Sequence, residues 1–323
     1  METLPKINIK LMTTLIQNNQ PYIKKLLSHF LRENYKEVHE TKEYIYAIGD
    51  IPIALVAHMD TVWEKELPKE RQLFYDKDKG VMFSPQGAGF DDKAGIYSII
   101  QIVKSGLRPH VIFTIDEETG CIGGSAIASI PCPFEDLRYI IQLDRRHVDD
   151  CVFYDCDNPE FISYVEEFGF VEHFGSFSDI SVICPSWGIA GVNLSVGYEN
   201  EHTRYEILYV QAMQNTIEKV KKMLTAEMPK QFKYIPLVFT GSSYYSDYDI
   251  HQCPGCKKHF FTEEIFPTIT KAGTIANYCP DCLVSHRVSW CVKCGRPFEE
   301  RKIGDKYCIF CAETKDDNTG TKR

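Results

Sequence analysis

Four C-x-x-C pairs near the C-terminus constrain this chain more than any other feature. Eight of the thirteen cysteines lie after residue 252, and all eight fall into such pairs. The pairs are Cys253 with Cys256, Cys279 with Cys282, Cys291 with Cys294, and Cys308 with Cys311. A C-x-x-C turn directs two thiolates toward one tetrahedral ion, and two turns complete a four-cysteine zinc site. The sequence therefore predicts a small module with two structural zinc ions over residues 253–323.

Two groupings of these pairs are open. In the sequential grouping, which we favour, the first two pairs form one zinc ribbon and the last two form another. In the cross-braced grouping, the first pair joins the third. A disulfide framework fits less well, because disulfides belong to secreted proteins and the N-terminal residues show no apolar run of a secretory signal. We expect a cytoplasmic protein whose ribbons need their metal to fold.

Charge and hydropathy exclude several classes of function. The chain has 36 basic and 45 acidic residues, a net charge of −9, and no apolar run of the length needed for a transmembrane helix. The segment from Cys253 onward carries twelve basic and nine acidic residues. Two four-thiolate zinc sites would bring it close to neutral, so nucleic acid is not a favoured partner. We expect the module to serve as a scaffold or to bind a protein partner.

The rest of the chain alternates apolar runs with helical patterns. This alternation predicts an α/β domain over residues 1–226, with a mixed, mostly parallel sheet flanked by helices. Residues 227–252, which end in GSSYYSDYDIHQ, are predicted to be a linker. Strands are expected over residues 51–57, 111–115, 139–143 and 189–196, and a hairpin over 73–83. Helices are expected over residues 21–35, 92–104, 123–129, 159–168 and 207–224.

Histidine and carboxylate side chains follow several of the predicted strands. Such strand ends are where α/β folds place their active sites. The side chains are those of His58, Asp60, Asp91, Asp92, Glu117, Glu118, Asp144 and His202. Each of these residues taken alone is more simply explained as a solvated or core residue. Their joint occurrence at the ends of successive strands is not explained in that way. Imidazole and carboxylate ligands together suit divalent metals, above all zinc.

These segments resemble the co-catalytic di-zinc exopeptidases and deacylases, the group that holds peptidase T, carboxypeptidase G and succinyl-diaminopimelate desuccinylase. The resemblance covers about residues 50–225. It is carried by AHMDTVW, GAGFDDKAG, TIDEETGCIGG, QLDRR and ENEHTRYE, which occur in the order of the family. It implies two catalytic zinc ions in addition to the two structural ones.

The resemblance also implies a role for each position. The metal ligands would be His58, Asp91, Glu118, Asp144 and His202. Asp91 would bridge the two ions. His58 and Asp144 would complete one site, and Glu118 and His202 the other.

Two further roles concern residues that do not bind metal. Asp60 would hydrogen-bond the far ring nitrogen of His58 and fix its tautomer. Glu117 would be the general base, which takes a proton from the attacking water and passes it to the leaving amine.

One departure from the family is large. Lidded members insert a dimerisation domain between the last acidic ligand and the last histidine, and this lid supplies a histidine to the partner subunit. Only 57 residues separate Asp144 from His202, so a lid-mediated dimer is not expected. Whether His147, His173 or Arg204 replaces the lid histidine stays open. The role of the GSFSDI segment, which contains Asp179, stays open too.

Peptide bond hydrolysis is the leading functional hypothesis, and the favoured enzyme is an aminopeptidase or a di- or tripeptidase. The alternative enzyme is an N-acyl amino acid deacylase, so the expected substrate is a small peptide or an N-acyl amino acid. The rival classes are an inactive hydrolase domain that acts as a zinc-ribbon adaptor, and a nucleic-acid-associated protein. An enzyme is favoured because all the ligand positions and the base are occupied by suitable residues.

Overall fold

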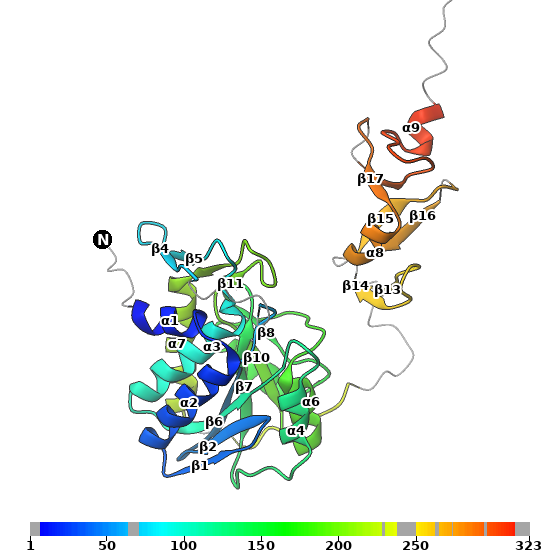
Figure 1. Ribbon diagram of the computed structural model, residues 1–323. Helices are drawn as coiled ribbons and strands as arrows, with labels where there is room; N and C mark the ends of the chain where they lie inside the picture. Colours follow the sequence, from blue (N-terminus) through cyan, green and yellow to red (C-terminus); the bar gives the residue numbers. More distant parts are fainter. Residues whose placement is uncertain are drawn as a thin grey trace, which may run out of the picture. The chain divides into compact units, whose positions relative to one another are not determined.

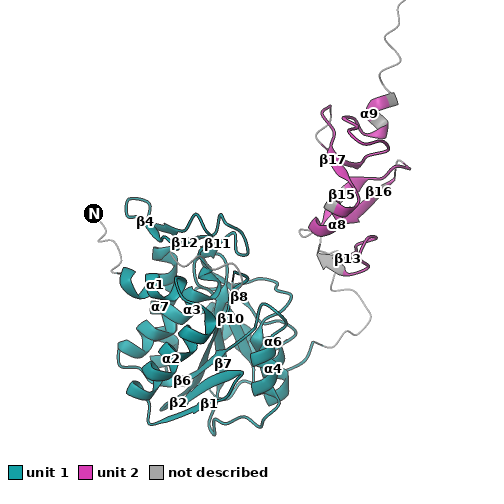
Figure 2. Cartoon of the chain, in the orientation of Figure 1, with its two compact units in different colours: residues 1–238 teal, residues 239–323 magenta. Residues whose placement is uncertain are grey.

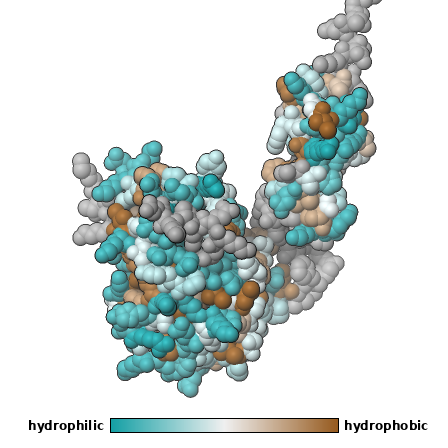
Figure 3. Space-filling model, in the orientation of Figure 1, coloured by the Kyte–Doolittle hydropathy of each residue, from teal (hydrophilic) through white to brown (hydrophobic). Residues whose placement is uncertain are grey.

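The chain forms two compact units. The computed structural model describes residues 7–63, 71–227, 230–237, 250–261, 265–272, 274–293 and 296–313. The first unit spans Met1–Val238 and the second spans Phe239–Arg323 (Figure 2). On the face shown in Figure 3, polar residues dominate the first unit and apolar ones are scattered. None of the helices in these ranges is long and apolar enough to cross a membrane.

An eight-stranded mixed sheet forms the centre of the first unit, in the order β1-β2-β6-β3-β7-β10-β8-β9 (Figure 1). Its strands are β1 (Glu37–Glu40), β2 (Tyr44–Ile48), β3 (Ile51–His58), β6 (Pro109–Thr114), β7 (Tyr139–Arg145), β8 (Asp150–Val152), β9 (Val171–Glu172) and β10 (Gly191–Ser195). The four central strands β6, β3, β7 and β10 are mutually parallel. The predicted α/β class with a mixed, mostly parallel sheet is therefore confirmed.

Helices cover both faces of this sheet (Figure 1). They are α1 (Ile9–Ile16), α2 (Gln20–Asn34), α3 (Phe90–Lys104), α4 (Ile122–Ala128), α5 (Pro159–Glu166), α6 (Asp179–Trp187) and α7 (Val210–Thr225). Alternate residues of a strand face opposite sides. Accordingly, Leu55 packs in the core with α1, α2, α3 and α7, whereas Val56 packs in a second core with α4 and α6.

A small four-stranded sheet, β11-β12-β5-β4, lies beside the large one. Its strands are β4 (Phe74–Asp76), β5 (Val81–Phe83), β11 (Tyr198–Glu199) and β12 (Ile207–Tyr209). The predicted hairpin is present as β4 and β5. The helix predicted from residue 207 was wrong at its start, because Ile207–Tyr209 pair with β5 and α7 begins only at Val210. Helices α1 and α6 and strands β1 and β2 were not predicted.

The predicted linker differs from the structure over residues 230–237, which pack on the first unit. Phe232 is buried among aromatic rings, with its centroid 5.0 Å from that of Phe161 and 5.3 Å from that of Tyr164. Its backbone N–H donates to Arg138 O, and its carbonyl accepts from Ala190 N–H, both at 2.9 Å. The buried Phe232 ring and these backbone hydrogen bonds thus extend the first unit beyond residue 226.

The second unit contains a hairpin and one continuous four-stranded sheet. The hairpin is β13 (Ile250–Gln252) with β14 (His259–Phe261). The sheet has the order β16-β15-β18-β17 and is accompanied by two short helices. These elements are β15 (Phe266–Ile269), β16 (Ile275–Tyr278), α8 (Pro280–Ser285), β17 (Val288–Trp290), β18 (Pro297–Glu299) and α9 (Ile309–Glu313).

This sheet joins the two expected ribbons. Strands β15 and β18 come from different ribbons and pair in parallel, with Ile269 opposite Phe298. The Tyr278 hydroxyl also donates to Glu299 Oε1 at 2.6 Å across the same boundary. The two halves are therefore not separate modules.

We predict that a chain ending at residue 238 is more stable than one ending at residue 226. The shorter chain lacks Phe232, and losing a buried Phe side chain costs about 3–5 kcal/mol. Urea unfolding should therefore show a lower midpoint for the shorter chain. Phe232→Ala in the longer chain should reproduce most of that loss. Equal midpoints for all three proteins would show that this segment does not belong to the first fold.

Candidate metal centre

The predicted site residues converge at one edge of the large sheet. The central strands are parallel, so their carboxyl ends share that edge. His58 ends β3, Asp144 lies near the end of β7, and Glu118 follows β6. Asp91 lies in the first turn of α3, and His202 lies in the loop between β11 and β12. Both sheets therefore contribute to the centre.

His58 lies at the buried side of the centre. Its Nδ1 is 3.2 Å from Asp60 Oδ1, and its Nε2 is 3.1 Å from Asp91 Oδ1 and 3.4 Å from Asp144 Oδ1. A proton on Nδ1, donated to Asp60, leaves the Nε2 lone pair directed at two carboxylate groups. This is the arrangement of a metal ligand oriented by a second carboxylate.

His202 lies at the solvent side, with about half of its side chain exposed. Its Nε2 is 3.0 Å from Asp91 Oδ2 and 2.9 Å from Glu118 Oε2. The Asp91 carboxylate therefore directs one oxygen toward each histidine. A carboxylate placed in this way can bridge two ions.

The atoms in the centre fit bound cations. Glu118 Oε1 is buried and accepts no hydrogen bond from any residue that the structure describes. Imidazole nitrogen and carboxylate oxygen are the ligands that zinc prefers outside cysteine sites. Ligand atoms of His58, Asp91 and Glu118 lie within 4.8 Å of one another, as do those of His58, Asp92 and Asp144. The donor set and the orphaned oxygen both point to divalent metal.

The raised pKa values of the two histidines indicate an excess of negative charge at the centre. Burial lowers the pKa of His58, but neighbouring carboxylates, above all that of Asp144, outweigh burial and hold the pKa well above its usual value. Hydrogen bonds with Asp91 and Glu118 raise the pKa of His202 to about 11. In a protein without metal, protons on these rings would neutralise the carboxylates, and bound cations would take the place of those protons.

Two more carboxyl groups of the centre have raised proton affinities. Burial raises the pKa of Asp144 to about 7 and that of Glu117 to about 9, despite the nearby His58 ring. A carboxyl group with a raised pKa suits a residue that must accept and release a proton.

The backbone of β10 deviates from a regular ladder to hold Asp144. The register between β7 and β10 shifts between Asn193 and Ser195. The Asn193 side chain fills the gap, because its Oδ1 accepts from Asp144 N–H at 2.9 Å and its Nδ2 donates to Asp144 O at 2.8 Å. The carboxylate itself accepts from the hydroxyls of Ser178 and Tyr198 at 3.0 and 3.2 Å.

Asp60 has a second role that the sequence did not predict. Its Oδ1 accepts from Glu117 N–H and its Oδ2 accepts from Glu118 N–H, both at 3.1 Å. One buried carboxylate therefore fixes both the His58 ring and the turn that carries the two glutamates.

Two supporting acids have contacts that the sequence did not predict: Glu206 was not singled out there, and Asp92 was named without a role. Both oxygens of buried Glu206 accept backbone hydrogen bonds, from Gly89 N–H at 2.5 Å and from Asp91 N–H at 3.0 Å. Asp92 accepts from His58 N–H at 3.1 Å and from Gly95 N–H at 2.9 Å. Glu206 lies within ENEHTRYE and Asp92 within GAGFDDKAG, so the motifs contained them without indicating their backbone partners.

The residues considered as substitutes for a lid histidine have other surroundings. His147 Nδ1 is 2.9 Å from Glu199 Oε1, and its Nε2 is 4.0 Å from Asp150 Oδ2. His173 Nε2 is 3.7 Å from Asp150 Oδ1. Arg204 is exposed in the loop between β11 and β12. The described residues between Asp144 and His202 form elements of the first unit and no inserted domain.

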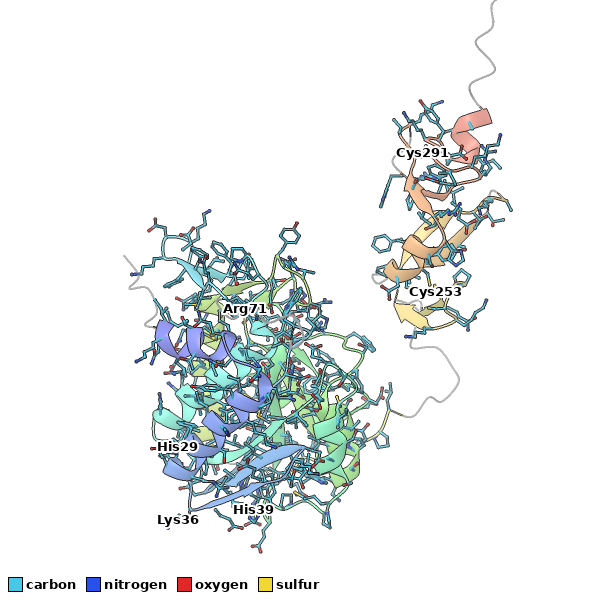
Figure 4. The ribbon with its side chains drawn as sticks, in the orientation of Figure 1. His29, Lys36, His39, Arg71, Cys253 and Cys291 are labelled. Carbon is cyan, nitrogen blue, oxygen red and sulfur yellow. The ribbon has the colours of Figure 1, made fainter. Side chains whose placement is uncertain are left out.

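The second unit brings the predicted cysteines together in the sequential grouping. One group consists of Cys253, Cys256, Cys279 and Cys282, and the other contains Cys291, Cys308 and Cys311. The remaining predicted ligand, Cys294, lies outside the described residues. Cys253 and Cys291 lie in different parts of the unit (Figure 4).

The thiols of the first cysteine group differ in proton affinity, because the pKa values of Cys279 and Cys282 are raised by burial and that of Cys253 is lowered. Backbone N–H groups of Cys279, Cys256 and Gly255 outweigh the effect of burial and lower the pKa of Cys253 to about 6. A thiolate is the form that binds zinc.

Comparison with solved structures shows a shared fold. The chain is similar to the aminopeptidase PepT from Bacillus cereus (TM-score 0.54, 16% identity, 67% of this chain and 96% of the other). It is similar to a tripeptidase from Staphylococcus aureus (TM-score 0.55, 14% identity, 67% and 96%). It is also similar to the TET1 peptidase from Pyrococcus horikoshii (TM-score 0.52, 12% identity, 68% and 99%). The first unit therefore has the fold of these peptidases.

Sequence comparison adds nothing to this. No protein family matches the sequence, and no curated protein is similar to it.

We predict that Glu206→Ala weakens metal binding at this centre. The change leaves the N–H groups of Gly89 and Asp91 without their acceptor and frees the turn that carries Asp91. Loss of such a supporting contact typically costs 10–100-fold in metal affinity. Competition with a chromophoric chelator measures the affinity of the first unit. Glu218→Ala, an exposed glutamate on α7, is the matched control and should bind as wild type. Wild-type affinity for Glu206→Ala would contradict this role.

Proposed function

We propose that the chain is a zinc-dependent hydrolase that cleaves a peptide bond with a water activated at a two-metal centre. The observation that carries this proposal is the Asp91 carboxylate, whose two oxygens lie 3.1 and 3.0 Å from His58 Nε2 and His202 Nε2. A carboxylate that faces two histidines can bridge a pair of metal ions. A site for a single ion would not require such a bridge.

We assign ligands to each of the two ions, and the short distances at Asp91 support this assignment. His58 and Asp144 would hold one ion together with Asp91, and Glu118 and His202 would hold the other. Zinc at this place supplies a Lewis acid for the carbonyl of the scissile bond and makes water nucleophilic at neutral pH.

Glu117 is the proposed general base. Its backbone is held by Asp60, and its neighbour Glu118 faces His202, so the two glutamates of one turn have different tasks. The Glu117 carboxylate takes a proton from the attacking water and then delivers it to the nitrogen of the leaving amine. Burial raises the pKa of Glu117 to about 9 in the absence of metal, and bound cations would lower it toward the range in which the carboxylate accepts a proton.

A peptide is the favoured substrate class. The solved structures with the same fold include an aminopeptidase and a tripeptidase. These names support a small peptide over an N-acyl amino acid. The exposed side of His202 supplies a route for the substrate to reach the centre from solvent.

Metal analysis tests the first part of this proposal. We expect four zinc ions per fully loaded chain, two in the first unit and two at the cysteine groups. A chain ending at residue 238 should hold two. Elemental analysis that finds two or fewer ions in the full chain would contradict the proposal.

Replacement of the base tests the second part. Glu117→Gln should keep both ions of the first unit and lose turnover by about 10²–10⁴-fold, because the change removes the proton acceptor and no ligand. Peptide hydrolysis and zinc content are measured on the same sample. The adjacent Glu118→Gln is the matched control, and it should lose metal as well as activity. A Glu117→Gln protein that hydrolyses peptides at the wild-type rate would rule out this mechanism.

A further inference from the structure

A fully buried acid lies behind the proposed base. Asp179 is the first residue of α6 and has no exposed surface. Its Oδ2 accepts a hydrogen bond from the hydroxyl of Thr114, which is also fully buried. Asp179 belongs to the GSFSDI segment, to which the sequence assigned no role.

The thiol of Cys121 lies beside the Glu117 carboxylate. Cys121 is fully buried, and its Sγ is 3.7 Å from Glu117 Oε1. The charge of the nearby Asp179 carboxyl group also raises the pKa of this thiol, and Asp179 Oδ1 itself accepts no hydrogen bond from the residues that the structure describes. The backbone fixes this position, because Cys121 N–H donates to Glu117 O at 2.9 Å and closes a tight turn.

Helix α4 leaves room for this acid through a glycine. A Cβ atom on Gly124 would lie 2.3 Å from Asp179 Oδ1. The close approach of α4 and α6 therefore encloses the carboxyl group next to Cys121. A buried carboxyl group without an ion partner is costly, so its presence here needs a reason.

We propose that Cys121 and Asp179 are positioning residues for Glu117: the Cys121 thiol donates to Glu117 Oε1, and the buried Asp179, held by Thr114 and enclosed against Gly124, fixes the start of α4 next to that thiol. This inference rests on the proposed function, in which Glu117 is the base. The Cys121 thiol donates to Oε1 of the Glu117 carboxylate at 3.7 Å. The thiol therefore leaves Oε2 for the attacking water.

The electrostatics support a thiol that stays protonated. Burial, together with the carboxyl groups of Asp179 and Glu117, raises the pKa of Cys121 far above its usual value. Burial also raises the pKa of Asp179, to about 6. A protonated thiol is a weak donor, which can orient a carboxylate without holding it as firmly as a cation would.

Kinetics with conservative variants test the proposal. Cys121→Ala should lower kcat about tenfold, with KM within about twofold and zinc content unchanged, because misplacement of a catalytic group affects turnover first. Cys121→Ser, which keeps a donor, should recover most of the loss. Asp179→Asn should lower kcat in the same direction. Cys151→Ala, which removes an equally buried cysteine in β8, is the control and should keep wild-type kcat.

A spectroscopic test is independent of activity. The infrared S–H stretching band of Cys121 is isolated as the difference between wild type and Cys121→Ala in the zinc-loaded full chain, where the ligand cysteines carry no thiol proton. We expect this band to move to higher frequency in Glu117→Gln, because an amide oxygen is a weaker acceptor than a carboxylate.

The outcomes separate the two proposals. If wild type hydrolyses no peptide, the proposed function fails, and the infrared band still decides whether the thiol binds Glu117. If wild type is active and Glu117→Gln is not, unchanged kcat in Cys121→Ala would overturn the inference. An S–H band that does not respond to Glu117→Gln would overturn it as well. Equal losses in Cys121→Ala and Cys121→Ser would show that the cysteine serves packing alone.

Discussion

The Asp91 carboxylate, placed between two histidines, is the contact on which the first unit depends. Several buried or half-buried acids surround it, and the cationic groups close to them include His58, His202 and Lys93. Burying unpaired charge costs several kcal/mol per ion. Protons on the two histidines, or the divalent cations that we propose in their place, compensate these acids at the sheet edge.

The sequence predicted the parts that depend on neighbours along the chain. Strands β3 and β7 are buried on both faces, so they read as apolar runs, and His58 and Asp144 stand out at their ends. The sequence did not predict contacts between residues that are far apart along the chain. Glu206 supports Asp91 across 115 positions, and nothing in its own neighbourhood indicates a backbone partner. Phe232 was missed for the same reason, because its partners Arg138, Phe161 and Ala190 are distant in the sequence.

Helix α6 shows how one short segment can serve two functions. Ser178 donates to Asp144, a proposed metal ligand, while the next residue, Asp179, accepts from Thr114 at the end of β6. The sequence did not predict this helix, which contains Pro185. Its capping box nevertheless fixes the N-terminal turn, and this turn places the two side chains on different sides of the centre.

The continuous sheet of the second unit has a consequence for its two cysteine groups. Because β15 and β18 pair directly, the strands that present one group are ordered by the strands that present the other. Binding at either group therefore prepares the other, which is thermodynamic linkage between two sites. The unit should therefore convert between an empty and a doubly occupied form in one step. Withdrawal of metal should show a single transition, and chains with one occupied group should be rare.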